Sequence, residues 1–131
     1  MIIVDSSVWI DYFRDRTTAQ VRRLDSLFDL GVLAVGDLTI SEILQGTNRD
    51  SDFQAALDTL SRFPVLMIGG RAIALQAARN YRMLRGRGIT IRKTIDTLIA
   101  TRCIADGHYL LYSGRDFEPF VAHLGLRSAL E

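Results

Sequence analysis

The 131-residue sequence predicts one α/β domain, spanning residues 1–131, in which helices cover both faces of a parallel β-sheet. Short apolar runs such as residues 1–4 and 32–35 show no alternation of polar and apolar positions, which is typical of strands buried on both faces. These runs alternate with segments whose apolar residues recur at helical spacing, as in parallel sheets. Because 48% of the residues are hydrophobic, the chain can bury a core without disulfides or structural metals.

The first half of the chain is expected to contain two strands and several helices, assigned from apolar spacing and from capping and stop residues. In order, the predicted elements are a strand over residues 1–4, a helix from Ser6 or Ser7, a helix capped by Thr17 or Thr18 and ended by Gly31, a strand over residues 32–35, a turn at Gly36 and Asp37, a short helix over residues 39–44 closed by Gly46, a polar linker over residues 48–52, and an amphipathic helix stopped by Pro64.

The second half continues the alternation. In order, the predicted elements are a strand over residues 65–68, a helix over residues 71–85, a basic loop over residues 85–93 with two glycines, a mostly apolar helix capped by Thr94 and ended by Gly107, a strand over residues 109–112, a loop over residues 113–117 that leads into a turn near Pro119, and a tail that can add an edge strand.

Composition gives limited information about partners. The formal net charge is +1, and all but one of the 16 basic residues are arginine, the exception being Lys93. Arginine binds phosphate groups bidentately, although an Arg-rich composition is equally well explained by the base composition of a genome.

The lone cysteine and the absence of long apolar segments bear on the compartment. Cys103 lies in an apolar helical run, so we expect a buried structural thiol in a reducing environment. No charged leader precedes a long apolar segment, so we expect neither a signal peptide nor a membrane span, and a cytoplasmic location.

Four acidic residues follow the predicted strands. Asp5 comes directly after the first strand, Glu42 lies on the helix after the second, and Asp116 lies in the loop after the fourth. Asp96 lies in the first turn of the helix that follows the basic loop. Because positions after parallel strands share one edge of the sheet, we expect Asp5, Glu42 and Asp116 to converge there, and Asp96 to join them if its helix begins at the same edge.

Each acid also has a structural explanation. Asp5 can cap the first helix, Thr39 and Glu42 match a capping box, Asp96 suits the positive end of its helix, and Asp116 can cap a turn. Taken together these explanations are weaker, because crowded carboxylates repel one another unless a cation binds them. Oxygen ligands without Cys or His favour Mg²⁺ or Mn²⁺ over zinc, and neither His108 nor His123 has metal-site spacing.

Such a metal site beside an Arg-rich loop suggests phosphate chemistry, in which a metal-activated water attacks a phosphodiester. Arg85, Arg87, Arg92 and Lys93 can bind the backbone of a polyanion, although a solvated charged loop explains them equally well. No nucleophile–His–acid arrangement and no Gly-x-x-x-x-Gly-Lys loop is present, which disfavours acyl transfer and P-loop nucleotide hydrolysis.

Several segments together resemble a PIN-domain ribonuclease of the VapC toxin type. These segments, which span nearly the whole chain, are Val4 to Asp11 (Val-Asp-Ser-Ser-Val-Trp-Ile-Asp), Ser41-Glu42-Ile43, Thr94 to Ala100 (Thr-Ile-Asp-Thr-Leu-Ile-Ala), and Leu110-Leu111 with Arg115-Asp116-Phe117. The resemblance implies a three-layer α/β/α sandwich with a parallel sheet of five strands. It also implies Mg²⁺- or Mn²⁺-dependent endoribonuclease activity, an antitoxin partner that blocks the site, and dimers. The family's acidic ligands fall on Asp5, Glu42, Asp96 and Asp116.

The last motif departs from the family. Many relatives carry Asp or Asn at the position of Gly114, so a fifth carboxylate is missing and Asp116 serves that end of the site alone. Ser113 is a candidate for a hydrogen bond to the RNA or to a metal-bound water.

Three hypotheses follow. In the first, Asp5 and Asp96 bind the principal metal ion, Glu42 orients or helps deprotonate the attacking water, and Asp116 completes the site or helps hold a second ion. In the second, the protein is a catalytically silent module that binds RNA or protein, which the missing acid at Gly114 supports. The third, a phospho-receiver-like switch, is disfavoured because Gly69 follows the strand that should supply the acceptor aspartate.

The first helix carries Trp9, Tyr12 and Phe13, which need not all fit one core face and therefore offer an apolar surface for a protein partner. Ordinary core packing is the better explanation for Trp9. No aromatic platform for stacking RNA bases is apparent.

Overall fold

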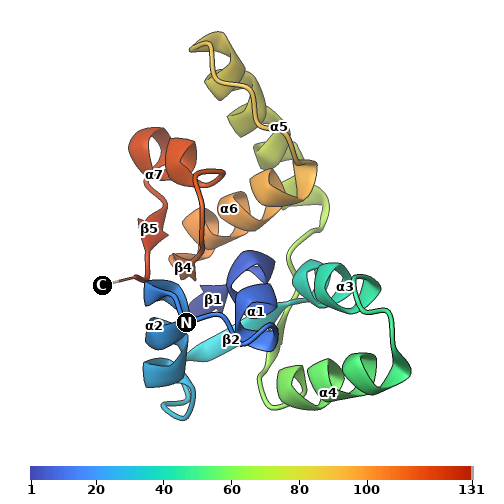
Figure 1. The fold of residues 1–131 in the computed structure, drawn as a ribbon. Helices are drawn as coiled ribbons and strands as arrows, with labels where there is room; N and C mark the ends of the chain where they lie inside the picture. The colour runs from blue at the N-terminus through green and yellow to red at the C-terminus, as the bar shows by residue number, and fades with distance from the viewer. Residues whose placement is uncertain (131) are drawn as a thin grey trace.

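The computed structural model describes residues 1–130 and confirms the predicted α/β/α sandwich (Figure 1). A five-stranded parallel sheet has the strand order β3-β2-β1-β4-β5, so β1 lies at its centre. The elements are β1 (Ile2–Val4), α1 (Ser6–Phe13), α2 (Ala19–Leu27), β2 (Leu33–Gly36), α3 (Asp37–Gln45), α4 (Asp50–Leu60), β3 (Val65–Leu66), α5 (Arg71–Gly86), α6 (Thr94–Asp106), β4 (Tyr109–Leu111), α7 (Glu118–Leu124) and β5 (Arg127–Ser128).

The central strands are apolar at every position because both of their faces are buried. Ile3 is paired with Ala34 and Leu110, and all three pack against α5, α6 and α7. The alternate residues Val4 and Leu111 point to the opposite face, where α1 to α4 cover the sheet. The absence of polar–apolar alternation in the sequence is thereby explained.

The edge strand β3 is shorter and more exposed than the predicted strand over residues 65–68. Only Val65 and Leu66 pair with β2, and Val65 and Met67 are 55% and 68% exposed. Ile68 leaves the strand and is fully buried against the helices of one face. Its backbone N–H donates to Asp37 Oδ1, which fixes the segment to the start of α3.

Several predicted helix boundaries were wrong. Gly36 and Asp37 form no turn, because α3 begins at Asp37 directly after β2. Thr39 is therefore a buried residue inside the first turn, and the capping box with Glu42 does not exist. Helix α4 begins at Asp50, within the predicted linker.

Two further predictions in the C-terminal half were wrong, whereas two predicted helix caps and one predicted helix end are confirmed. Thr94 is the first residue of α6 rather than its cap, and the turn near Pro119 is the short helix α7. The predicted caps Asp5 and Thr18 are confirmed, since each accepts a backbone N–H of its helix. Gly107 ends α6 in the left-handed conformation, with φ +73°.

The buried residues include both singled-out side chains Trp9 and Cys103. Trp9 is 1% exposed and packs in the core beneath α1, which confirms the core interpretation. Cys103 is fully buried, and burial raises the pKa of its thiol to about 12. Within residues 1–130, no helix has the length and apolar character needed to cross a membrane.

Gly36 allows β2 and the segment after β3 to approach closely. A Cβ atom built there would lie 2.8 Å from Cγ1 of the fully buried Ile68. We therefore expect Gly36→Ala to lower the free energy of unfolding by about 1–3 kcal/mol, because a packed core does not absorb an added methyl group.

Urea unfolding followed by circular dichroism measures this effect. Gly69→Ala is the matched control, because nothing lies within 4 Å of its Cβ position and its φ is not in the left-handed region. Equal stability of the two variants would contradict the close approach.

Candidate active site

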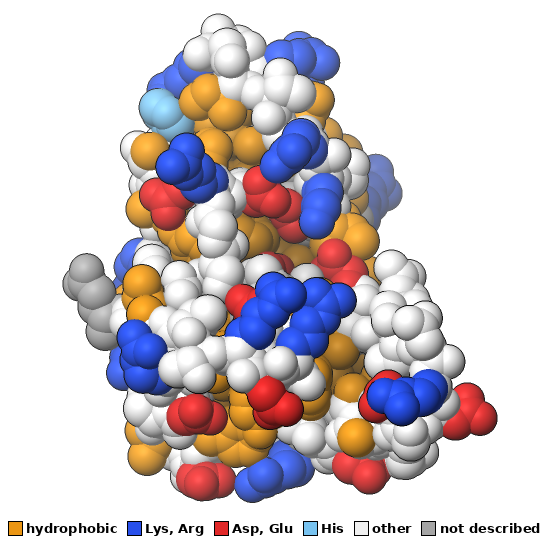
Figure 2. All heavy atoms as spheres, viewed as in Figure 1, with side chains coloured by type: hydrophobic (Ala, Val, Ile, Leu, Met, Phe, Trp, Pro, Cys, Tyr) orange, Lys and Arg blue, Asp and Glu red, His pale blue; other side chains and the backbone are white. Residues whose placement is uncertain are grey.

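Asp5, Glu42 and Asp116 lie on segments that follow the carboxyl ends of strands, and Asp96 lies at the start of α6, which follows α5. Asp5 lies between β1 and α1, Glu42 in the second turn of α3, Asp96 in the first turn of α6, and Asp116 between β4 and α7. Asp5 and Asp96 are buried, at 5% and 6% exposure. Figure 2 shows acidic side chains gathered in the hollow between α5–α7 and α1–α3, with basic side chains around them.

Asp5 is held through only one of its carboxylate oxygens. Oδ2 accepts hydrogen bonds from the backbone N–H of Ser7, at 3.0 Å, and from the Ser7 hydroxyl, at 2.6 Å. Oδ1 is buried and has no hydrogen-bond partner among residues 1–130. One oxygen therefore caps α1 while the other remains available to a ligand.

Ser7 also joins the two central strands at the site. Its Oγ accepts a hydrogen bond of 3.1 Å from the backbone N–H of Ser113, in the loop after β4. The Asp5 backbone N–H donates to Leu111 O at 2.9 Å. The orientation of Asp5 is thus fixed from both α1 and β4. The hydroxyl of Ser113 itself is buried without a partner.

The carboxylates interact electrostatically. Burial raises the pKa of Asp96 to about 6, and the negative charges of Asp5, Asp116 and Glu42 add to the rise. Burial also raises the pKa of Asp5. Burial and then the charge of Asp5 raise the pKa of Glu42, which a hydrogen bond from Ser6 opposes. The structure therefore brings Asp5, Glu42 and Asp116 within electrostatic reach of Asp96.

The acids do not form a closed ligand cage. In the described part of the chain, no three Asp, Glu, His or Cys side chains lie closely enough together to hold a metal ion. Mutual repulsion is expected to keep carboxylates apart when no cation lies between them. A divalent cation nevertheless fits the donor set, since Asp5 Oδ1 and Glu42 Oε1 are both buried without partners and hard cations prefer carboxylate oxygen.

The predicted basic residues divide into two groups. The charge of Lys93 lowers the pKa of Asp5, Glu42 and Asp96, which places its ammonium group near these acids. Arg92 Nη2 forms an ion pair of 3.3 Å with Asp116 Oδ1.

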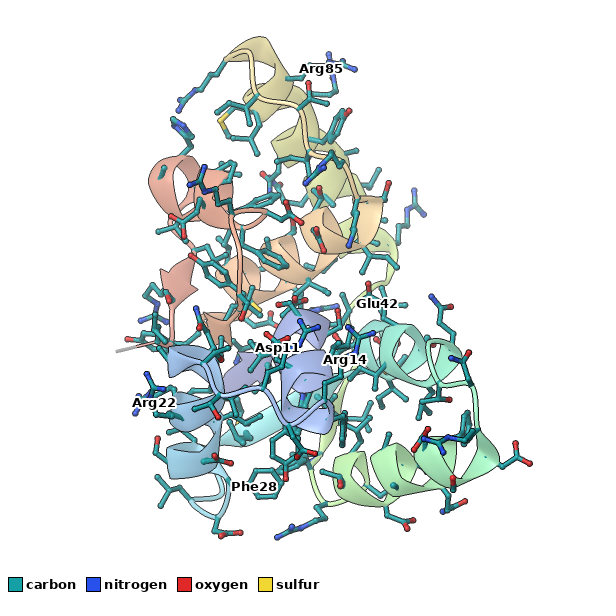
Figure 3. All side chains as sticks on the ribbon, viewed as in Figure 1. Asp11, Arg14, Arg22, Phe28, Glu42 and Arg85 are labelled. Carbon is teal, nitrogen blue, oxygen red and sulfur yellow. The ribbon has the colours of Figure 1, made fainter. Side chains whose placement is uncertain are left out.

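Arg85 and Arg87 lie elsewhere. Arg85 lies at the end of α5 that extends away from the sheet, far from Glu42 (Figure 3), and its guanidinium lies over the Tyr81 ring. Arg87 contacts His123 of α7 at 2.9 Å. The structure thus does not bring these two arginines to the carboxylates.

Gly114, the position at which the family resemblance led us to expect an acid or an amide, has φ +82° and nothing within 4 Å of its Cβ position. A left-handed conformation favours glycine over aspartate at this position. The backbone conformation of the loop therefore explains why glycine, and not an acid, stands at this position.

Arg14, which directly follows α1, is a residue that the sequence analysis missed. It lies beside Glu42 in Figure 3 and lines a groove that Glu42 also lines. An exposed arginine at the end of a helix gives no signal in the sequence, and only the packing of α1 against α3 brings it to the site.

Comparison with known proteins decides the family. A model of the PIN domain matches residues 2–120. The chain belongs to the PIN-domain family. Ribonuclease VapC11 of Mycobacterium tuberculosis is 30% identical over 132 residues, covering 98% of both chains, so this PIN domain is of the VapC type.

Two solved structures have the same fold as this PIN domain. The VapBC2 structure from Rickettsia felis, bound to a promoter DNA fragment, has a TM-score of 0.75 at 20% identity and covers 98% of this chain and 97% of the other. A toxin-antitoxin complex from Klebsiella pneumoniae has a TM-score of 0.71 at 18% identity, with 98% of each chain covered.

The raised pKa of Asp96 predicts how the stability of the metal-free PIN domain depends on pH. The Asp96 carboxyl group binds a proton more tightly in the folded protein than in the unfolded chain. Protonation of Asp96 therefore stabilises the fold at low pH, and this contribution is lost as the pH rises through about 6. At about pH 7.5 in EDTA, the side chain of Asp96 is ionised, and its buried negative charge destabilises the folded protein. Asp96→Asn removes this charge, so we expect it to raise the free energy of unfolding by roughly 1–2 kcal/mol.

Denaturant unfolding at several pH values tests this. Asp25→Asn, on the exposed face of α2, is the control and is expected to change stability by about 0.5 kcal/mol or less. A destabilising Asp96→Asn substitution near neutral pH would mean that the carboxylate is paired and not repelled.

Ser7→Ala removes both the bond to Asp5 Oδ2 and the acceptor of the Ser113 N–H. We expect it to cost about 1–2 kcal/mol of stability, and Ser7→Thr to cost less because it keeps the hydroxyl. Ser26→Ala, which removes an exposed hydroxyl on α2, is the comparison in the same thermal unfolding assay. Similar losses for Ser7→Ala and Ser26→Ala would disprove the linking role of Ser7.

Proposed function

We propose that this protein is a metal-dependent endoribonuclease that acts as the toxin of a toxin–antitoxin pair. The observation that carries the proposal is the pair of buried, unpartnered oxygens on Asp5 and Glu42, within a group of electrostatically coupled carboxylates. The family supports the same function, since a relative at 30% identity is named a ribonuclease.

Asp5, Asp96, Glu42 and Asp116 are the residues that would hold Mg²⁺ or Mn²⁺. Asp5 and Asp96, which are the most buried, would supply the principal ligands. When bound, the cation supplies a water of lowered pKa and neutralises charge that develops on the phosphate. Carboxylate ligands without nitrogen or sulfur are those that Mg²⁺ and Mn²⁺ prefer.

The protein's own residues orient the reactants. The Ser7 bond holds Asp5 by Oδ2 and so directs Oδ1 away from the helix cap. The raised pKa of Glu42 suits this carboxylate to accept a proton from the attacking water. Lys93, near three of the acids, would bind the scissile phosphate, and Arg92 can turn from Asp116 to a neighbouring phosphate because the side chain is exposed.

Attack of water on the phosphorus with departure of the 3′ oxygen leaves a 5′-phosphate and a 3′-hydroxyl. The partners of the protein are an RNA substrate and an antitoxin that blocks the site. A solved toxin-antitoxin complex with the same fold supports the second partner. A homodimer and a cytoplasmic location are part of the same proposal.

Asp5→Asn tests the chemistry with little change to the fold, because asparagine is an equally good helix cap. We expect cleavage of single-stranded RNA in Mg²⁺ to fall by about 100-fold or more, while the thermal unfolding midpoint is retained. The antitoxin must be removed before the assay, and the 5′ ends of the products are sequenced. Asp25→Asn serves as the control with unchanged activity.

Full cleavage in EDTA would overturn the proposal. If the wild-type protein binds RNA but cleaves none in Mg²⁺ or Mn²⁺, the catalytically silent binding module is the correct interpretation.

A further inference from the structure

A groove of about 420 Å³ lies between α1, α3 and α4. Its apolar lining includes Ile10, Phe13 and Ile43, and its polar lining includes Arg14, Glu42 and Arg49. The volume lies within the range of sites that enclose small organic ligands. The groove therefore has both apolar and charged walls, and its volume suits a small ligand.

The groove and the acidic site share Glu42. Its Oε1 is buried without a partner, and its pKa is raised in part by the charge of Asp5. Figure 3 shows Glu42 on α3 and Arg14 at the end of α1 on the same side of the molecule. A linear polymer bound at the carboxylates can thus extend along the surface into the groove.

Arg14 is the cation of the groove that no acid neutralises. The neighbouring Arg16 pairs with Asp11 at 3.3 Å, and Arg49 pairs with Asp52 at 3.2 Å. Among residues 1–130, the guanidinium of Arg14 makes neither an ion pair nor a hydrogen bond. A free guanidinium beside a site for phosphodiester chemistry is complementary to a phosphate group.

Phe13 gives the groove an aromatic wall that is fixed in place. Its ring stacks on Trp9, with centroids 5.8 Å apart and planes 21° apart, and it meets Tyr12 edge to face. Because Trp9 is buried in the core, its stacking contact fixes the orientation of the Phe13 ring. A ring held in this way loses little conformational entropy when a planar group packs against it.

We propose that the groove is a subsite for the nucleotide next to the cleaved phosphodiester of single-stranded RNA. Arg14 binds the phosphate of this nucleotide and Phe13 packs against its base. The inference rests on the proposed function. RNA is favoured over a peptide because the groove shares a catalytic carboxylate and presents an unneutralised cation suited to phosphate.

Arg14→Gln is the decisive variant. With a short single-stranded RNA of mixed sequence that the wild type cleaves in Mg²⁺, we expect KM to rise about 5- to 20-fold and kcat to change less than about twofold. The slope of log(kcat/KM) against log of salt concentration should fall in magnitude by about 0.7, because one phosphate contact is lost.

Arg22→Gln is the matched control. Arg22 is an exposed arginine on α2, away from Glu42 in Figure 3, and its removal should leave KM and the salt slope unchanged. Arg14→Lys keeps the charge and should restore most of the salt slope but only part of the affinity, because lysine lacks the bidentate geometry.

The outcomes separate this inference from the proposed function. If the wild type cleaves RNA and Arg14→Gln changes neither KM nor the salt slope, the subsite is wrong while the nuclease stands. If Arg14→Gln weakens binding of the antitoxin alone and leaves RNA kinetics intact, the groove is a protein-binding site and the inference is overturned. If the wild type cleaves no RNA, the proposed function fails and the subsite fails with it.

Discussion

The hydrogen bond between Ser7 and Asp5 is the interaction on which the arrangement of the site depends. It occupies one carboxylate oxygen in capping α1 and leaves the other buried and unpartnered. The same hydroxyl accepts from the loop after β4, so a single side chain fixes Asp5 relative to both central strands. Asp5 therefore serves as a helix cap and as a candidate ligand at once, two roles that sequence reasoning treats as alternatives.

The cost of this arrangement is electrostatic. Asp96 and Glu42 are placed near Asp5 and partly or wholly away from water, where their negative charges are unfavourable. Lys93 offsets part of the repulsion but is one charge against several. When no cation is bound, the grouped carboxylates lower the stability of the fold. Such a cost is common at functional sites, where residues are selected for chemistry rather than for stability.

The sequence was sufficient for the features that depend on local signals. Buried strands, the caps at Asp5 and Thr18, and the end of α6 at Gly107 follow from residue type and spacing, and the structure confirms them. The placement of Asp5, Glu42 and Asp116 after strands follows from the parallel arrangement of the sheet, whereas Asp96 joins them because α6 begins near them. Their roles as ligands remain a prediction.

The features that were missed depend on contacts between distant segments. The Thr39–Glu42 spacing matches a capping box, but it occurs inside α3 because this helix begins at Asp37, directly after β2. Arg85 and Lys93 are close in sequence, yet α5 continues to Gly86 and carries Arg85 away from the sheet. Arg14 becomes part of the site only through the packing of α1 and α3.

The position of β1 at the centre of the sheet has a consequence for synthesis of the chain. This strand is made well before its neighbour β4 and before the acids Asp96 and Asp116. A partly synthesised chain therefore has Asp5 and Glu42 without the other half of the acidic group, and its central strand lacks a partner on one side. Because such long-range pairing must wait for the later segments, the molecule cannot assemble its candidate active centre until α6, β4 and the loop that carries Asp116 have been made.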